Sequence, residues 1–127
     1  GLTRRGEWEW LLKKPELDFL LIKNLDFASL KSFQFDALVP LFSTNFHRTC
    51  WNIVWTSPSA RIEASLDMGE VSAQGKTSSI CELELELLEG DESALMVVAE
   101  YLGQTINLEP CDKGKAEKGF QLINSAF

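Results

Sequence analysis

The stretch CELELELLEGD, residues 81–91, holds the densest set of side chains that could do chemistry. As a β-strand it places Glu82, Glu84 and Glu86 on one face and three leucines on the other, because successive side chains alternate across the pleat. Carboxylates two residues apart on a strand lie roughly 6.5 to 7 Å apart, so they repel unless water, arginine or a metal ion neutralises them. The pattern therefore predicts either a charged site or the solvated face of an antiparallel strand.

The segment ARIEASLDMGEV, residues 60–71, repeats this arrangement with both signs of charge. Arg61, Glu63 and Asp67 share one face with a serine, and apolar residues occupy the other face. A barrel that turned such faces inward would have an ionic interior, which is costly unless it binds a charged ligand. A flat sheet would instead turn the same faces to water. Both architectures are compatible with the alternation alone.

Composition and charge exclude several other classes of function. A net charge of −7 and a pI near 4.7 disfavour a surface that binds nucleic acid through its phosphates. No run approaches the roughly 18 apolar residues of a membrane span, and no signal-peptide pattern is present, so we expect a cytoplasmic protein without a membrane partner. The three cysteines form no CxxC pair, which disfavours zinc and disulfide frameworks. His47 has no partner at catalytic spacing, so we expect it to be structural.

Strands must position most of these residues. Period-two alternation and β-branched or aromatic content predict strands in four segments: residues 3–12, 44–55, 60–71 and 81–91. Turn signals lie at residues 57–59 and around Gly75. The tryptophans are best explained as packing on the outside of a sheet.

Helices are fewer than strands. Asp91 is a plausible N-cap for a helix that ends at Gly103 and buries one apolar face against a sheet. A second short helix is predicted from Lys115 to about Ile123. Residues 36–42 are expected to form a turn of helix. The combination of a sheet and few helices predicts an α+β fold.

Four stretches, PLFSTNFHRTCW, RIEASLDMGEV, ICELELELLEGD and KAEKGFQL, match a known family in order and spacing. They resemble the CYTH family, also called triphosphate tunnel metalloenzymes, and in particular its bacterial inorganic triphosphatases. The resemblance covers nearly the whole chain. It implies an antiparallel β-sheet that forms part of a CYTH-type triphosphate tunnel barrel, with a few flanking helices. It also implies that a linear triphosphate binds there through Mg2+ or Mn2+.

The resemblance assigns the acidic residues a metal-binding and catalytic role. Glu82, Glu84 and Asp67 correspond to tunnel acids that hold the metal and position water, and Glu63 and Glu86 project the same way, Glu63 as a further candidate metal ligand. Hard cations prefer carboxylate oxygens. Hydrolysis of a phosphoanhydride needs charge neutralisation and a positioned water more than a covalent nucleophile.

The basic residues are implied to bind the substrate. Arg48 and Arg61 correspond to tunnel arginines, and guanidinium groups match phosphate oxygens bidentately. Both arginines could instead form ordinary cross-strand ion pairs with glutamates. Lys115 corresponds to the lysine of a Ser-Lys-Ala motif on a C-terminal helix that plugs the tunnel, or else it lies at a solvated helix start. Gly114 replaces the serine, which weakens the helix cap.

The implied activity is hydrolysis of inorganic triphosphate to diphosphate and phosphate. Thiamine triphosphatase or class IV adenylate cyclase activity of the same family, or a noncatalytic polyphosphate-binding module, are the alternatives. The family begins with an ExExK strand that this sequence lacks. We therefore expect residues 1–127 to be the C-terminal portion of a single CYTH domain whose N-terminal half is absent, inactive alone. Unpaired sheet edges would then promote self-association.

Overall fold

The computed structural model describes residues 6–25 and 34–124. The chain divides into two compact units, Gly1–Val39 and Pro40–Phe127. The first unit contains helix α1 (Phe19–Lys23) and a short 3-10 helix, η2 (Phe35–Ala37), which lies at the start of the helical turn expected there. The Asp18 carboxylate caps α1 by accepting a hydrogen bond of 3.1 Å from the Leu20 N–H.

The prediction of a strand at residues 3–12 is wrong for the part that the structure describes. Residues 6–12 are not in a strand, and residues 3–5 lie outside the described residues. Alternation states only how side chains would distribute if a strand formed. A strand also requires a neighbour that pairs with its backbone N–H and C=O groups. Among the described strands, none pairs with this segment.

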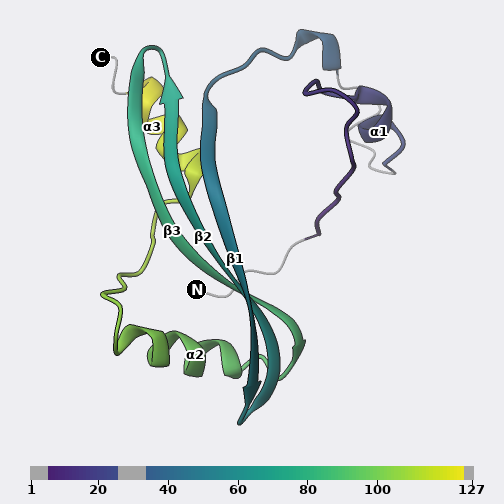
Figure 1. The fold of residues 1–127 in the computed structure, drawn as a ribbon. Coiled ribbons are helices and arrows are strands. Elements are labelled where there is room, and N and C mark those ends of the chain that lie inside the picture. Colours follow the sequence, from purple (N-terminus) through teal and green to yellow (C-terminus); the bar gives the residue numbers. More distant parts are fainter. Residues whose placement is uncertain (1–5, 26–33, 125–127) are drawn as a thin grey trace. The chain divides into compact units, whose positions relative to one another are not determined.

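The second unit contains a three-stranded antiparallel sheet in the order β1-β2-β3 (Figure 1). The strands are β1 (Ser43–Thr56), β2 (Ser59–Ala73) and β3 (Lys76–Gly90), which confirms the other three predicted strands and the α+β class. Both residues between β2 and β3 have positive φ, 53° at Gln74 and 76° at Gly75. A two-residue hairpin turn whose twist matches that of the strands needs such angles, and glycine adopts them freely.

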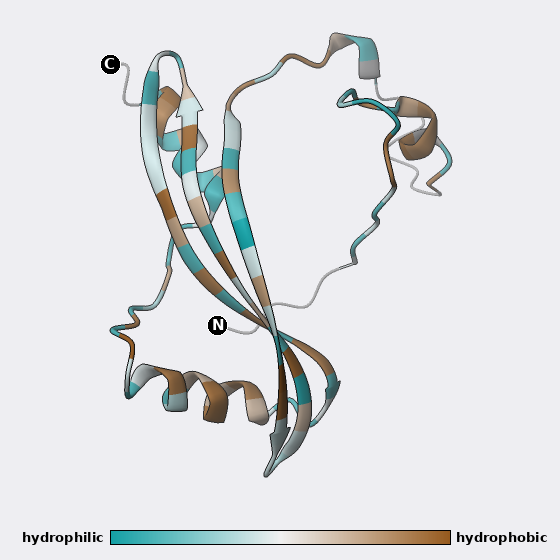
Figure 2. Ribbon diagram, in the orientation of Figure 1, coloured by the Kyte–Doolittle hydropathy of each residue, from teal (hydrophilic) through white to brown (hydrophobic). Residues whose placement is uncertain are grey.

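The two faces of this sheet differ in chemistry. The register pairs Arg48 with Asp67 and Asp67 with Glu82, so these side chains share one face, the polar face. Ile62 pairs with apolar residues on both neighbouring strands and lies on the opposite, apolar face. Figure 2 shows the resulting alternation of hydrophilic and hydrophobic bands along the strands.

Helix α2 (Ala94–Gly103) covers the apolar face near the β1–β2 turn. Ala94 and Val98 are buried against Ala60 and Ile62, which form the core of this end. The partly buried apolar residues packed around it are Ile53, Trp55, Leu85, Leu87, Leu95 and Leu102. Leu95, Val98 and Leu102, which recur at helical spacing, therefore belong to this core, in agreement with the predicted apolar face of the helix.

The start of α2 differs from the prediction, because Ser93 and not Asp91 occupies the N-cap position. The Asp91 carboxylate instead accepts hydrogen bonds from the Ser93 N–H (2.9 Å) and hydroxyl (2.8 Å). The hydrogen bond from the Ser93 backbone is the main cause that lowers the pKa of Asp91. Aspartate side chains readily form such turns with the backbone two residues on, which delays the helix.

Helix α3 (Lys115–Asn124) lies on the polar face toward the β2–β3 turn, with nearly the bounds predicted (Figure 1). Its Gly119 packs against the Phe42 ring so closely that a Cβ atom there would overlap the ring. The rings of Phe42 and Phe120 meet edge to face with centroids 5.3 Å apart. Of the helices in the described residues, none is long and apolar enough to cross a membrane.

Candidate functional site

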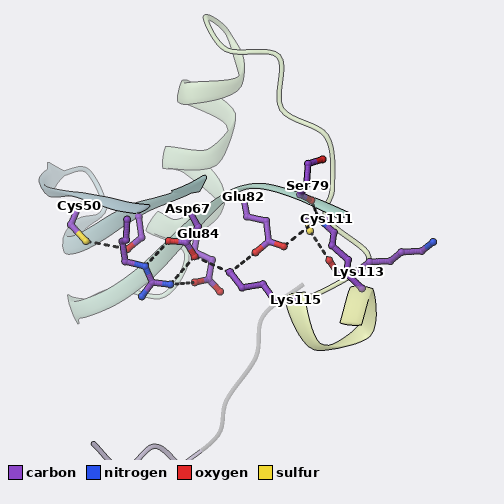
Figure 3. A network of polar contacts seen from close by, with 11 residues as sticks. Cys50, Asp67, Ser79, Glu82, Glu84, Cys111, Lys113 and Lys115 are labelled. Atoms are coloured by element: carbon purple, nitrogen blue, oxygen red, sulfur yellow. Dashed lines mark hydrogen bonds and ion pairs between the residues drawn. The ribbon is translucent and has the colours of Figure 1, made fainter. Parts of the chain in front are cut away.

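Cross-strand pairing gathers four of the predicted site residues on the polar face (Figure 3). Arg48, Asp67 and Glu82 form one row across β1, β2 and β3. Glu84 lies in the next row, opposite Ser65. Neighbouring rows on one face lie roughly 6.5 to 7 Å apart, so all four side chains are within reach of one small ligand.

Asp67 is the buried centre of this cluster, with only 1% of its side chain exposed. Arg48 donates two hydrogen bonds to it, from Nε to Oδ1 (2.6 Å) and from Nη2 to Oδ2 (2.8 Å). Lys115 Nζ lies 2.8 Å from Oδ2. The hydrogen bond from Arg48, supported by Lys115 and opposed by burial, lowers the pKa of Asp67 to about 2. The carboxylate is therefore ionised at neutral pH, and the same pairing raises the pKa of Arg48.

Glu82 lies beside Asp67 and is also largely buried, with 10% of its side chain exposed. Lys115 Nζ donates a hydrogen bond of 2.6 Å to Oε2. Oε1 is buried and has no hydrogen-bond partner among the described residues, although Lys118 Nζ lies 3.7 Å away. A buried carboxylate oxygen without a hydrogen bond is unusual and points to a missing partner.

Lys115 links the two buried acids from the first turn of α3. Burial lowers its pKa, but the hydrogen bonds to Asp67 and Glu82 outweigh this effect, so the pKa of Lys115 is raised. The Gly114 carbonyl accepts the Lys118 N–H (3.1 Å), so Gly114 lies at the helix start without a capping side chain. The ion pairs therefore hold Lys115 despite the weak cap, with 20% of its side chain exposed.

An aromatic ring contacts both cations that hold Asp67. The Phe46 ring centroid is 4.8 Å from Lys115 Nζ and 5.5 Å from Arg48 Cζ, within the range of cation–π attraction. Phe46 pairs in register with Gly69, where a Cβ atom would overlap the β1 backbone. Gly69, two residues after Asp67, thus lets β1 approach β2 closely beside the site.

The cluster balances its own charge. It contains three carboxylates and three cations, namely Asp67, Glu82, Glu84, Arg48, Lys115 and Lys118. Glu84 is 65% exposed, and its carboxylate is 4.0 Å from Arg48 Nη2, at the limit for an ion pair. Of the three carboxylates, Glu84 is therefore the most weakly paired. Guanidinium and ammonium groups suit phosphate oxygens, and carboxylates suit divalent cations. A polyphosphate would bind here through donors of Arg48 and Lys115 that Asp67 and Glu82 do not use.

The donor set fits a hard divalent cation in part. In the described part of the chain, no three His, Cys, Asp or Glu side chains gather closely enough to hold a metal ion by themselves. Arg48 and Lys115 occupy the space between the acids instead. The buried, unbonded Oε1 of Glu82 and the exposed Glu84 are oxygen donors of the kind that Mg2+ prefers.

Two predicted residues lie outside this cluster. Arg61 is six residues from Asp67 on β2, which corresponds to roughly 20 Å. A β-bulge at Leu88 aligns Arg61 with Glu89, and Arg61 Nη1 lies 3.7 Å from Glu89 Oε2. Glu63 pairs in register with Glu86, two rows from Asp67. Their assignments to phosphate and metal remain predictions.

Lys118 was not predicted from the sequence. It lies three residues after Lys115, on the same side of α3, and its Nζ donates a hydrogen bond of 3.1 Å to the Ser79 carbonyl. The sequence offered one indication of Lys118, which is that it lies three residues from Lys115 in KGKAEKGF, within the predicted helix. Sequence spacing alone does not say that Ser79 and Glu82 lie opposite that helix.

Comparison with known proteins identifies a family and a relative of known name. The CYTH domain family model matches residues 1–120. The inorganic triphosphatase of Haemophilus influenzae is 29% identical over 125 residues. That alignment covers 92% of this chain and 35% of the relative, so the chain spans about a third of the relative's length.

Proposed function

Because the chain belongs to the CYTH domain family, we propose that the protein carrying it hydrolyses inorganic triphosphate to diphosphate and phosphate with a divalent metal ion. The observation that supports this most is the row Arg48, Asp67 and Glu82, joined by Lys115. Such a row offers both the cations that a polyphosphate needs and the carboxylates that a metal needs. The likeness to a protein named an inorganic triphosphatase supports the choice of substrate.

Arg48 and Lys115 are the proposed substrate-binding cations. Both now hold Asp67, and both carry further hydrogen-bond donors that can reach phosphate oxygens. Arg48 is 45% exposed, so one side of its guanidinium group is open to a ligand. Asp67 keeps both cations charged and oriented, since it is ionised at neutral pH.

The carboxylates Glu82, Glu84 and Asp67, with Glu63 as a further candidate, would hold Mg2+ or Mn2+. When bound, such an ion neutralises charge on the triphosphate and stabilises the leaving diphosphate. Glu84 is the acid proposed to accept a hydrogen bond from the attacking water, because its carboxylate is exposed and only loosely paired. The burial of Asp67 and Glu82 makes them better suited to hold charges than to exchange protons.

Phosphate release is the measurement that tests this function. The full-length protein is assayed with triphosphate, ATP and thiamine triphosphate, with and without Mg2+, and we expect metal-dependent release that is fastest from triphosphate. Preference for thiamine triphosphate, or formation of cyclic AMP from ATP, would identify one of the other family activities. Binding of triphosphate without release from any substrate would identify a noncatalytic module.

We also propose that the 127-residue chain self-associates through its strand edges. β1 and β3 are the outer strands of the described sheet, and unpaired edges recruit further strands. Light scattering coupled to size exclusion should then give a mass above 14.3 kDa. A monomer of that mass that unfolds cooperatively would contradict the proposal.

A further inference from the structure

The two oxygens of Glu82 have different surroundings. Oε2 accepts a hydrogen bond of 2.6 Å from Lys115. Oε1 is buried without a hydrogen-bond partner among the described residues, and Lys118 Nζ lies 3.7 Å from it. That distance is an ion pair but is too long for a hydrogen bond. The charge of Lys118 thus partly neutralises Oε1, but Oε1 accepts no hydrogen bond from the described residues.

The ammonium group of Lys118 is held in this position by another partner. Its Nζ donates a hydrogen bond of 3.1 Å to the Ser79 carbonyl on β3, and only 20% of the side chain is exposed. Lys118 therefore has an anchor that does not depend on Glu82. If a second cation approached Oε1, Lys118 would keep this hydrogen bond and lose only a long ion pair.

We infer that Lys118 is an internal counter-ion that neutralises Oε1 of Glu82 in the metal-free protein and competes there with the divalent metal ion. The inference rests on the proposed function for the presence of a metal ion. Two cations cannot share one small buried site without repulsion, so the ammonium group weakens metal binding. Its removal should strengthen metal binding, because it leaves the metal-free cluster with one uncompensated negative charge beside Glu82.

Lys115 is not the residue that exchanges with the metal. It makes short contacts to both acids, 2.8 Å to Asp67 and 2.6 Å to Glu82, so its displacement would break two charge-assisted hydrogen bonds. Lys118 makes no such bond to a carboxylate in the described structure. The two lysines, one helical turn apart, thus have separate roles.

The test is the affinity for Mn2+ alone, measured on the full-length protein by calorimetry or by the electron paramagnetic resonance signal of free Mn2+. Lys118→Met keeps the aliphatic stem and removes the charge, and it should tighten the Kd about three- to tenfold, the range of a weak to moderate ion pair. Lys118→Arg, which keeps the charge, should stay within about twofold of wild type. Lys113→Met, the same change at an exposed lysine before α3, is the matched control and should have no effect.

A double substitution shows whether the effect acts through Glu82. In a Glu82→Gln background, Lys118→Met should no longer change the Kd, because the shared carboxylate is gone. An unchanged or weaker Kd in Lys118→Met, or the same tightening in the Glu82→Gln background, would overturn the inference. Lys118→Gln gives a second neutral variant if the methionine variant does not fold. Because Mn2+ binding is measured without triphosphate, this outcome is independent of whether triphosphate is hydrolysed.

Discussion

The two ends of one sheet are covered by helices of equal length in different ways. At one end, α2 places Ala94 and Val98 against the apolar face, where they join Ile62 in a core without charges. At the other end, α3 places Lys115 and Lys118 against buried carboxylates on the polar face. Each helix has ten residues, so the difference lies in what the two helices bury.

This difference separates stability from function. Burial of apolar side chains stabilises the α2 end and responds little to pH or to ions. The α3 end depends on charges that balance one another, so it responds to pH, to metal ions and to anionic ligands. Substitutions near α2 should therefore change the free energy of unfolding alone, whereas those near α3 should also change binding and turnover.

The largest expected effect is on turnover at the α3 end. Glu82→Ala in the full-length protein should lower metal-dependent triphosphate hydrolysis about 100- to 1,000-fold, as loss of a charge-positioning group does. Glu100→Ala, the same change at an exposed position of α2, is the control and should stay within about threefold of wild type. Wild-type turnover in folded Glu82→Ala would contradict the claim that the α3 end supports catalysis.

The same variant also tests which interactions stabilise the α3 end. The row of glutamates alone predicts that removing one relieves repulsion and leaves stability unchanged or higher. The structure places Glu82 between Lys115 and Lys118, so its loss leaves buried ammonium groups short of a partner. We now expect Glu82→Ala to lower the free energy of unfolding, measured by urea denaturation.

At the α2 end, Ile62→Ala should lower the free energy of unfolding by about 2 to 4 kcal/mol, because Ile62 is fully buried and its truncation leaves a cavity. Val54→Ala, at a strand position that is 74% exposed, should cost less than about 0.5 kcal/mol. Urea denaturation measures both changes. Turnover of the Ile62 variant at low temperature should stay near wild type, and a loss comparable to that of Glu82→Ala would break the separation between the two ends.

Acid should destabilise the α3 end through Asp67. Its pKa is about 2, below the ordinary 3.8, so the folded state favours the ionised form. The corresponding stabilisation, about 2 kcal/mol, is present above about pH 4 and is lost as the pH falls through 2. Asp67→Asn should remove this dependence between pH 4 and 2, whereas Asp112→Asn, at an exposed position, should not. The measurement is the free energy of unfolding by urea denaturation at several pH values in this range. If its slope against pH were unchanged in Asp67→Asn, other groups would govern acid unfolding.

Lys115 makes the stability of the same cluster sensitive to alkaline pH, and it is also a proposed substrate-binding residue. Its pKa is raised above the ordinary 10.5, so its stabilisation persists at lower pH and is lost as the pH rises through the raised value. Lys115→Ala in the full-length protein should raise the KM for triphosphate about tenfold with a smaller change in kcat, because a clamp present in ground and transition states contributes uniform binding. An unchanged KM would argue for a purely structural lysine.

The smallest effect concerns the start of α3. Gly114→Ser restores a capping side chain at a position where an added Cβ meets no atom within 4 Å. It should raise the free energy of unfolding by a few tenths of a kcal/mol, about the difference between serine and glycine at an N-cap. The same substitution at Gly119, where a side chain would overlap Phe42, should instead destabilise the chain. Equal effects at the two glycines would contradict the packing of α3.

The local pattern of the sequence predicted much of the fold. Alternation identified β2 and β3, because a strand with one dry face must alternate, and the turn at Gly75 separated them. Aromatic and β-branched content identified β1. Alternation also placed Asp67 and Glu82 each on the charged face of its own strand, and the family resemblance assigned both to the tunnel. Alternation failed at residues 6–12, where the pattern is present but no described strand pairs with it. Asp91 was misassigned as the cap because its carboxylate bonds the Ser93 backbone in a turn instead.

The sequence by itself determined which side chains alternate, where the hairpin turns and which family the motifs resemble, because these depend on neighbours along the chain. Only the tertiary structure decided which charges meet. The register sets Arg48 beside Asp67, and the bulge at Leu88 aligns Arg61 with Glu89. The docking of α3 brings Lys115 and Lys118 to Glu82 from more than thirty residues away. Contacts of this kind depend on how separate elements pack, and the spacing of residues within one element contains no information about its partner.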